Sequence, residues 1–226
     1  MACMNDPQIA PTPPRTTSRA LAFRHELANC ISHGVGLVLA IAMLPVLMVS
    51  ATKGGSIHFS IGATVFGGTV VLLYLSSTLY HSLTHERAKH VFRLFDHSSI
   101  FLLIAGTYTP FALGVLRGPW GWTLLTIVWV LAVLGVATKV AFGVRYPWIS
   151  MTLYLLMGWL ALAAVKPILL NVPVPGILLI LAGGIAYTGG LAFFASRRLR
   201  YGHFIWHLFV ITGTTCHYFA VLWYAA

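Results

Sequence analysis

The chain has 226 residues, of which 58% are hydrophobic and only 8% are charged. A soluble domain normally carries roughly 25% charged residues, so this composition excludes an ordinary soluble protein. The formal net charge of +10 would suit a nucleic-acid-binding protein. The basic residues are scattered between apolar runs and form no patch, however, so we expect no nucleic-acid partner.

The N-terminal segment, residues 1–24, is polar and rich in Pro, Thr and Arg. It lacks the apolar core and the small-residue cleavage site of a signal peptide. We therefore expect a disordered cytoplasmic tail over residues 1–24 and a transmembrane domain over residues 25–226, in which the first helix serves as an uncleaved anchor.

Beyond this tail, the sequence is a series of apolar runs separated by short breaks that contain Gly, Pro and charged residues. A membrane-spanning helix needs about 20 mostly apolar residues. Candidate helices fall at residues 27–50, 57–82, 92–114, 119–141, 146–166, 174–195 and 203–224. The predicted fold is an all-α integral membrane bundle of seven transmembrane helices.

The orientation of this bundle follows from the distribution of Lys and Arg between its two sides. If the N-terminus is cytoplasmic, the cytoplasmic side receives all but three of the 14 basic residues. These are Arg15, Arg19, Arg24, Arg87, Lys89, Arg93, Lys139, Arg145, Arg197, Arg198 and Arg200, against Lys53, Arg117 and Lys166 on the other side. We therefore expect a cytoplasmic N-terminus and a C-terminus outside.

Polar residues of several predicted helices meet at one depth near the cytoplasmic face. The second helix ends there with His81, and the third begins there with Asp96. The seventh begins there with His203 and His207. Because ionisable side chains inside a membrane are energetically costly, they usually face the interior of the helix bundle or a cavity.

The spacing of these histidines predicts a metal site. His203 and His207 are spaced i, i+4, so their imidazoles project from one helix face about 6 Å apart, and His81 can supply a third nitrogen. Zinc prefers such ligands in tetrahedral geometry, and three protein ligands leave one position open, as in catalytic sites. Asp96 lies at the right depth to hydrogen-bond a bound water or to orient a ligand histidine. Ser77, one turn before His81, could contact the same water or a substrate carbonyl.

Further polar residues accompany this cluster. Three of them share roughly one face of the first helix: Glu26, Asn29 and His33. They could shape the site, or Glu26 could simply offset the charge of Arg24, and both interpretations stay open. His217 lies about 15 Å deeper than His207, too far to share the metal, and we expect it to be packed or hydrogen-bonded.

Several segments of the chain occur in the same order as in a known family. They are Glu26-Leu27-Ala28-Asn29 with Ser32-His33, Ser76-Ser77-Thr78-Leu79-Tyr80-His81, Phe92-Arg93-Leu94-Phe95-Asp96-His97, Ile104-Ala105-Gly106-Thr107-Tyr108-Thr109-Pro110-Phe111, and His203 to His217. Over nearly all of residues 23–224 the chain resembles the haemolysin III family, the bacterial branch of the progestin and adipoQ receptor superfamily.

This resemblance implies a seven-helix protein of a bacterial inner membrane, with His81, His203 and His207 as zinc ligands. It also implies that Asp96 binds the water and that Ser77 lies beside it. The adiponectin receptors and alkaline ceramidases look like distant relatives, and they imply hydrolysis of a lipid amide such as a ceramide. The family name instead implies lysis of red cells by a pore.

Three hypotheses on function stay open. The first is a zinc-dependent hydrolase that acts on a lipid amide or related lipid, with membrane lipids as partners. The second is a pore-forming cytolysin or channel, which should show a polar stripe along a whole helix. The polar residues cluster at one end instead, so a single chain would have to oligomerise to make a pore. The third is a sensor of membrane state in which zinc is structural.

Overall fold

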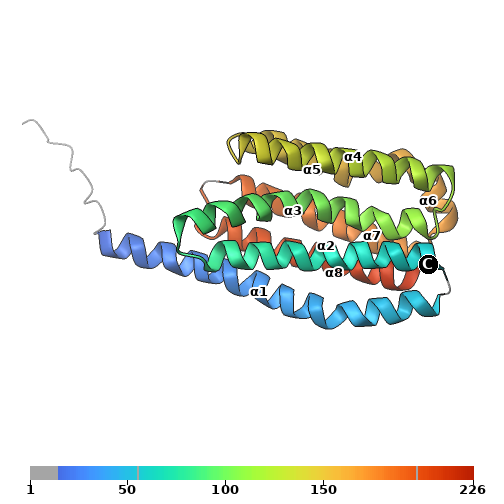
Figure 1. The fold of residues 1–226 in the computed structure, drawn as a ribbon, viewed down its shortest axis with the longest axis horizontal. Coiled ribbons are helices and arrows are strands. Elements are labelled where there is room, and N and C mark those ends of the chain that lie inside the picture. The colour runs from blue at the N-terminus through green and yellow to red at the C-terminus, as the bar shows by residue number, and fades with distance from the viewer. Residues whose placement is uncertain (1–14, 55, 197) are drawn as a thin grey trace, which may run out of the picture.

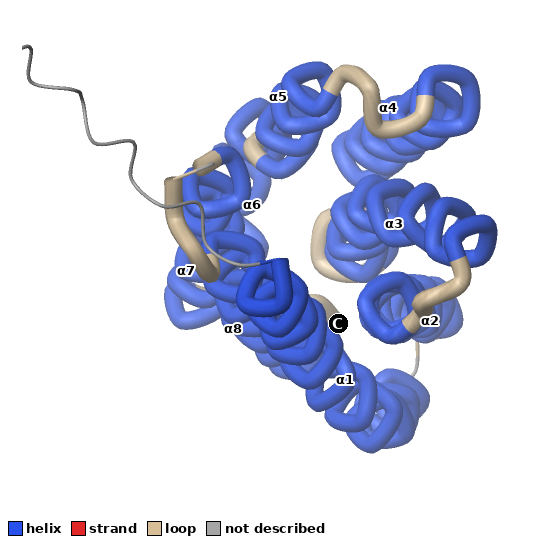
Figure 2. The backbone as a smooth tube through the Cα atoms, turned by 90° about the vertical axis from the view of Figure 1, so that its left-hand side faces the viewer, coloured by secondary structure: helices blue, strands red, loops and turns tan. Residues whose placement is uncertain are grey.

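The computed structural model describes residues 15–54, 56–196 and 198–226, with side chains from residue 20 onward. Gly55 and Arg197, which the sequence places in connections between helices, lie outside it, as do residues 1–14. The described chain is built from helices without any strand (Figure 2). The helices are α1 (Arg15–Lys53), α2 (Ile57–Ser82), α3 (Glu86–Leu113), α4 (Pro119–Phe142), α5 (Pro147–Gly158), the 3-10 helix η1 (Leu160–Ala164), α6 (Val165–Asn171), α7 (Val174–Ala195) and α8 (Gly202–Tyr224).

The helices run along one common axis (Figure 1). α1 packs against α2 and α8, α3 lies between α2 and α4, and α7 pairs with α8. The end-on view in Figure 2 shows α4 and α5 on the side of the bundle opposite α1. This arrangement brings the end of α2 and the starts of α3 and α8 to the same end of the bundle.

The described helices are long and apolar enough for a membrane bundle. Spans of sufficient length and hydropathy within the described residues are Ala20–Lys53, Ile57–Ser82, Pro119–Phe142, Pro147–Asn171, Val174–Ala195 and Gly202–Tyr224. α3 has the length of a span, but its first half carries the charges of Glu86, Arg87, Lys89, Arg93 and Asp96. Counting α3, and α5 to α6 as one unit, the described chain makes seven spans. The prediction of an all-α, multi-span membrane protein is confirmed.

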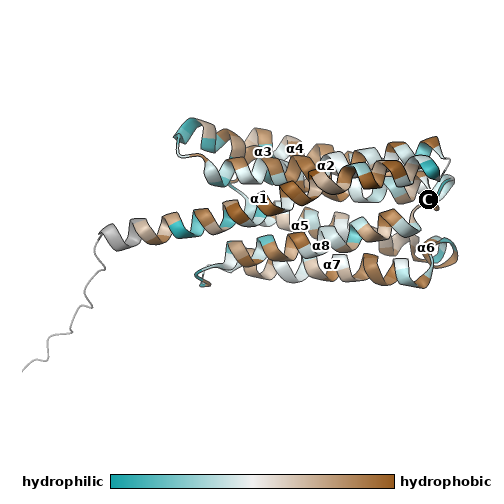
Figure 3. Ribbon diagram, turned by 90° about the horizontal axis from the view of Figure 1, so that it is seen from below, coloured by the Kyte–Doolittle hydropathy of each residue, from teal (hydrophilic) through white to brown (hydrophobic). Residues whose placement is uncertain are grey.

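The distribution of hydropathy along the bundle agrees with this fold. Figure 3 shows hydrophobic residues over the middle of the helices and hydrophilic ones towards both ends, among them the start of α3 and the first half of α1. The predicted metal ligands lie at the end of the bundle where α3 starts.

α1 begins earlier than the sequence suggested. Residues 15–24, which we assigned to a disordered tail, form the first turns of α1. This segment contains Ala, Leu and Arg, which are good helix formers, and it continues directly into the apolar run. The remaining part of the predicted tail, residues 1–14, lies outside the described residues.

The fifth span is broken, which hydropathy does not reveal. α5 ends at Gly158, and the chain continues through η1 into α6. The Tyr108 hydroxyl of α3 lies 2.9 Å from the carbonyl oxygens of Met157 and Gly158. It also accepts the N–H of Ala161 at 2.9 Å. Inside a membrane, the backbone N–H and C=O groups that a helix break leaves unpaired must be hydrogen-bonded by other groups of the protein.

Glycines allow α2 and α3 to pack closely. A Cβ atom on Gly62 would lie 2.6 Å from the Cα atom and 2.9 Å from the nitrogen of Pro110 in α3. Small residues at helix contacts are typical of membrane bundles, where van der Waals packing drives association.

Candidate metal centre

Three histidines converge where α2 ends and α8 begins. His81 lies in the last turn of α2, and His203 and His207 lie in the first two turns of α8. One ligand nitrogen of each lies within 4.8 Å of the other two, and this is the group among the described residues with metal-binding geometry. His81 and His207 are buried, and His203 is partly buried. The structure therefore brings the three predicted ligands together.

The spacing of the ligand atoms fits a tetrahedral zinc ion. The Nε2 atoms of His81 and His203 are 3.2 Å apart. Two ligands about 2.0–2.1 Å from a tetrahedral ion lie about 3.3 Å from each other. A zinc ion would be met by the lone pairs of both nitrogens, whereas without a metal one of the two rings can donate a hydrogen bond to the other.

The other nitrogen of His81 is held by α1. The His81 Nδ1–H donates to Glu26 Oε2 at 2.7 Å, and the second oxygen of Glu26 lies 3.2 Å from Lys89 Nζ. Because Nδ1 carries the proton, Nε2 presents its lone pair to the metal position. Ligand histidines are commonly oriented by a carboxylate in this way.

His207 is also held by α1. Its Nδ1 lies 3.2 Å from the Asn29 carbonyl oxygen and 2.9 Å from Ser32 Oγ. The Ser32 hydroxyl itself donates to the Asn29 carbonyl. Nδ1–H must therefore be the donor to both oxygens, which leaves Nε2 of His207 free to bind a metal.

A fourth histidine, His33, lies against the cluster. Its ring stacks on His207 with a centroid distance of 3.5 Å and an interplanar angle of 7°. His33 Nδ1 is 2.7 Å from the hydroxyl oxygen of Ser77, and its Nε2 is buried without a hydrogen-bond partner in the described chain. Ser77 Oγ therefore has His33 as one partner, and a hydroxyl can make more than one hydrogen bond. Its predicted contact with a water or substrate stays a prediction.

The cluster opens into a mainly apolar cavity between α3, α5, α7 and α8, which we call the proximal cavity. Its volume is about 100 Å³, and Asp96, His203 and His207 line it together. Asp96 is buried in α3. The Ser99 hydroxyl donates to the Asp96 backbone carbonyl at 2.8 Å and lies 3.1 Å from Ser76 Oγ of α2. These contacts tie the Asp96 turn to α2.

A family model described as "Haemolysin-III related" matches residues 21–218. The chain belongs to the haemolysin III family. It is 47% identical over 201 residues to "Hemolysin-3" of Bacillus cereus, covering 89% of this chain and 92% of that protein. It is 45% identical over 202 residues to "Hemolysin-3 homolog" of Bacillus subtilis (strain 168), covering 89% and 95%.

Similarity extends beyond the haemolysin III family itself. The chain is 28% identical over 203 residues to "Monocyte to macrophage differentiation factor" of Homo sapiens, covering 86% of this chain and 82% of that protein. This match agrees with the wider superfamily that the sequence motifs indicate. The membrane location expected for a haemolysin III protein agrees with the spans of the described chain.

The sequence of this haemolysin III protein left the role of α1 open, and the structure assigns it. Glu26 holds His81, and Asn29 and Ser32 hold His207, so Glu26 does more than offset a nearby positive charge. Ser32 had no assigned role. The signal was its spacing of three residues from Asn29, which places both on one face of α1.

Proposed function

We propose that this haemolysin III protein is a zinc-dependent membrane hydrolase that acts on a lipid amide or a related lipid. The observation that carries the proposal is the convergence of His81, His203 and His207, of which His81 and His207 are held by α1 at their other nitrogen. A site with three protein ligands keeps a position for water or substrate, which is the pattern of catalytic zinc.

The protein groups around the cluster supply the remaining parts of a hydrolytic reaction. Zinc, when bound, supplies an activated water and a Lewis acid for the carbonyl. A carboxylate oxygen of Asp96 takes the proton that is released as water attacks the amide carbonyl. Asp96 then returns this proton to the departing amine, so that water and amide become a carboxylic acid and an amine.

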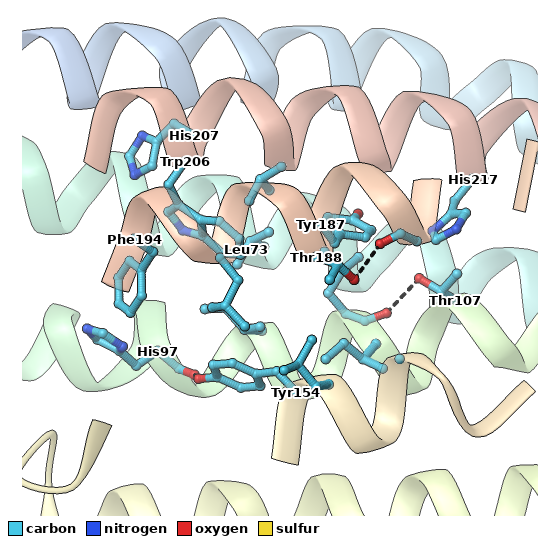
Figure 4. A pocket seen from close by; sticks show the side chains of 18 of the residues that line it. Leu73, His97, Thr107, Tyr154, Tyr187, Thr188, Phe194, Trp206, His207 and His217 are labelled. Atoms are coloured by element: carbon cyan, nitrogen blue, oxygen red, sulfur yellow. Dashed lines mark hydrogen bonds between the residues drawn. The ribbon is translucent and has the colours of Figure 1, made fainter. Parts of the chain in front are cut away.

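The proximal cavity supports a lipid as the substrate. Its lining beyond the histidines is dominated by apolar side chains, among them Leu73, Leu103 and Leu191. Figure 4 shows these apolar surroundings next to His207 and Trp206. An apolar chain from the bilayer can enter such a space because it meets surroundings as apolar as the lipid that it leaves, and its head group would then meet the histidines and Asp96.

The first experiment measures the zinc content of the purified protein. Protein purified without chelators should contain about one zinc per chain, and His207→Ala should lose it. His90→Ala, which removes an exposed histidine at the start of α3, should keep it. Metal-free wild-type protein, or equal loss in both variants, would rule out a zinc site at this cluster.

Turnover is tested with Asp96→Asn. This variant should keep its zinc and lose about 100- to 10,000-fold in the release of fatty acid from a fluorescent ceramide, because it lacks the proton acceptor. If Asp96→Asn hydrolyses the lipid as fast as the wild type, Asp96 is not the base. If the zinc-loaded wild type releases no fatty acid from a panel of amide and ester lipids, the hydrolase is ruled out for these lipids. The result would then favour a sensor in which zinc is structural.

The names of the two bacterial relatives favour a second candidate, a cytolysin. A pore through one chain requires a polar path, whereas the cavity lining here is mostly apolar away from the histidine cluster. Dye leakage from liposomes on addition of the purified chain would support the cytolysin, and intact liposomes would argue against it.

A further inference from the structure

His217 occupies a position in α8 where an apolar side chain would be expected. It is 8% exposed, and it lines the proximal cavity as well as a second cavity of about 220 Å³, the distal cavity. The two cavities share wall residues, including Thr107, Tyr108 and Trp159. They therefore adjoin each other, and His217 lies where they meet.

The orientation of the His217 ring is fixed by α7. Its Nε2 lies 3.1 Å from the carbonyl oxygen of Ile180. A carbonyl can only accept, so Nε2 carries the proton. A Cβ atom on Gly183 would collide with this edge of the ring, so the glycine is what allows the ring to lie between α7 and α8.

The opposite nitrogen, Nδ1, is a hydrogen-bond acceptor without a partner. It is buried and forms no hydrogen bond with the described residues. In a neutral imidazole that donates from Nε2, Nδ1 carries a lone pair. Buried polar atoms in native proteins usually have a partner, so an exception requires an explanation, such as a water or a ligand.

The polar groups near His217 are acceptors as well. The hydroxyls of Thr107 and Thr188 donate to carbonyl oxygens within their own helices. The Thr214 hydroxyl is likewise committed to its helix, so Tyr187 donates its proton to Thr214 Oγ1 at 2.8 Å. Because these hydroxyl protons are already donated to other groups, the hydroxyl oxygens around His217 can only accept further hydrogen bonds. A carboxylate or phosphate would be repelled there, whereas a hydroxyl would be attracted.

His217 lies at a definite distance from the metal centre. Ten residues of α8 separate it from His207, or about 15 Å at 1.5 Å per residue. Figure 4 shows His207 and His217 at opposite ends of the cavity, on the same helix. A ligand whose head group meets the histidine cluster would therefore reach His217 part-way along its apolar chain.

We propose that His217 Nδ1 accepts a hydrogen bond from a hydroxyl group carried part-way along the apolar chain of the ligand. The inference rests on the proposed function only in placing the head group at the histidine cluster. It assigns to this protein a preference for mid-chain hydroxylated lipids over unsubstituted ones. His217 is then a specificity-determining residue, with no part in the bond cleavage.

The test compares the binding of ricinoleic acid and oleic acid, which differ by one mid-chain hydroxyl. Zinc-loaded, delipidated protein in detergent should bind ricinoleic acid about 2- to 10-fold more tightly, the range expected for one net hydrogen bond. His217→Phe keeps a ring of similar size but lacks the acceptor. It should bind oleic acid as the wild type does and lose the preference. An equal affinity of the wild type for both acids, as expected if only water occupies the site, would overturn the proposal.

A second measurement needs no variant and guards against a His217→Phe protein that fails to fold. Stearic acid hydroxylated in mid-chain should bind the wild type more tightly than stearic acid hydroxylated next to the carboxyl group. The reverse order, or equal affinities, would overturn the subsite. Because these are binding measurements, a failure to find turnover would count against the hydrolase and leave the subsite standing.

Discussion

At the scale of single residues, Glu26 connects α1 to the histidine cluster. Its carboxylate accepts the His81 Nδ1–H at 2.7 Å and is itself flanked by Lys89. We expect Glu26→Gln to weaken zinc binding about 10- to 100-fold, because the amide keeps the shape but loses the charge that orients and polarises the ligand histidine. Competition with a chelator of known affinity measures the change.

Glu86→Gln is the matched control for Glu26→Gln. Glu86 is an exposed acid in the first turn of α3, and its charge is removed by the same substitution. If the two variants bind zinc equally well, the bond between Glu26 and His81 has no influence on the metal.

The candidate site could be predicted from the sequence only in part. The His203 and His207 spacing is local, so helix geometry alone places both rings on one face. The hydrogen bonds of Asn29 and Ser32 to His207 depend on how α1 crosses α8, and no local pattern encodes that crossing. Likewise, the bond between Ser77 and His33 requires the packing of α1 on α2.

At the scale of elements, hydrophobic run length predicted where the helices lie and missed how the fifth span is built. A hydropathy average is the same for an α-helix and for a 3-10 segment, so it cannot detect η1 between α5 and α6. The break depends on the Tyr108 hydroxyl, a partner from a different helix. It matters for function because Gly158 and Trp159, where α5 ends, line both cavities.

The packing of α2 on α3 gives a prediction about stability. A methyl group on Gly62 would lie 2.6 Å from the Cα atom of Pro110. A backbone atom cannot relieve such a contact by a change of rotamer, as a side chain can. We expect Gly62→Ala to destabilise the fold by about 1–3 kcal/mol, as overpacked contacts do. The midpoint of thermal unfolding in detergent measures the effect.

Gly68→Ala, on the same helix, provides the comparison for Gly62→Ala. A Cβ atom on Gly68 would meet nothing within 4 Å. Ala has a higher helix propensity than Gly, so this midpoint should stay the same or rise. A similar fall in both variants would mean that α2 needs both glycines for a reason other than contact with α3.

At the scale of the whole molecule, the histidine cluster and the end of the chain lie at opposite ends of the bundle. The Val115 N–H, in the connection from α3 to α4, donates to the Ala225 carbonyl at 3.2 Å. The C-terminus therefore shares its end of the bundle with that connection, where Arg117 lies. The start of α8, which carries the ligand histidines, lies at the other end together with the start of α3 (Figure 1).

The charge bias assigns these ends to the two sides of the membrane. Single cysteines at the exposed positions Arg117 and Arg198 test the assignment, in a background that lacks Cys3, Cys30 and Cys216. In intact cells stripped of any outer membrane, a membrane-impermeant maleimide should label Arg117→Cys at once. It should label Arg198→Cys only after permeabilisation. The reverse pattern would place the histidine cluster and Asp96 near the outer face, so that the proposed hydrolase would draw its substrate head groups from the outer leaflet.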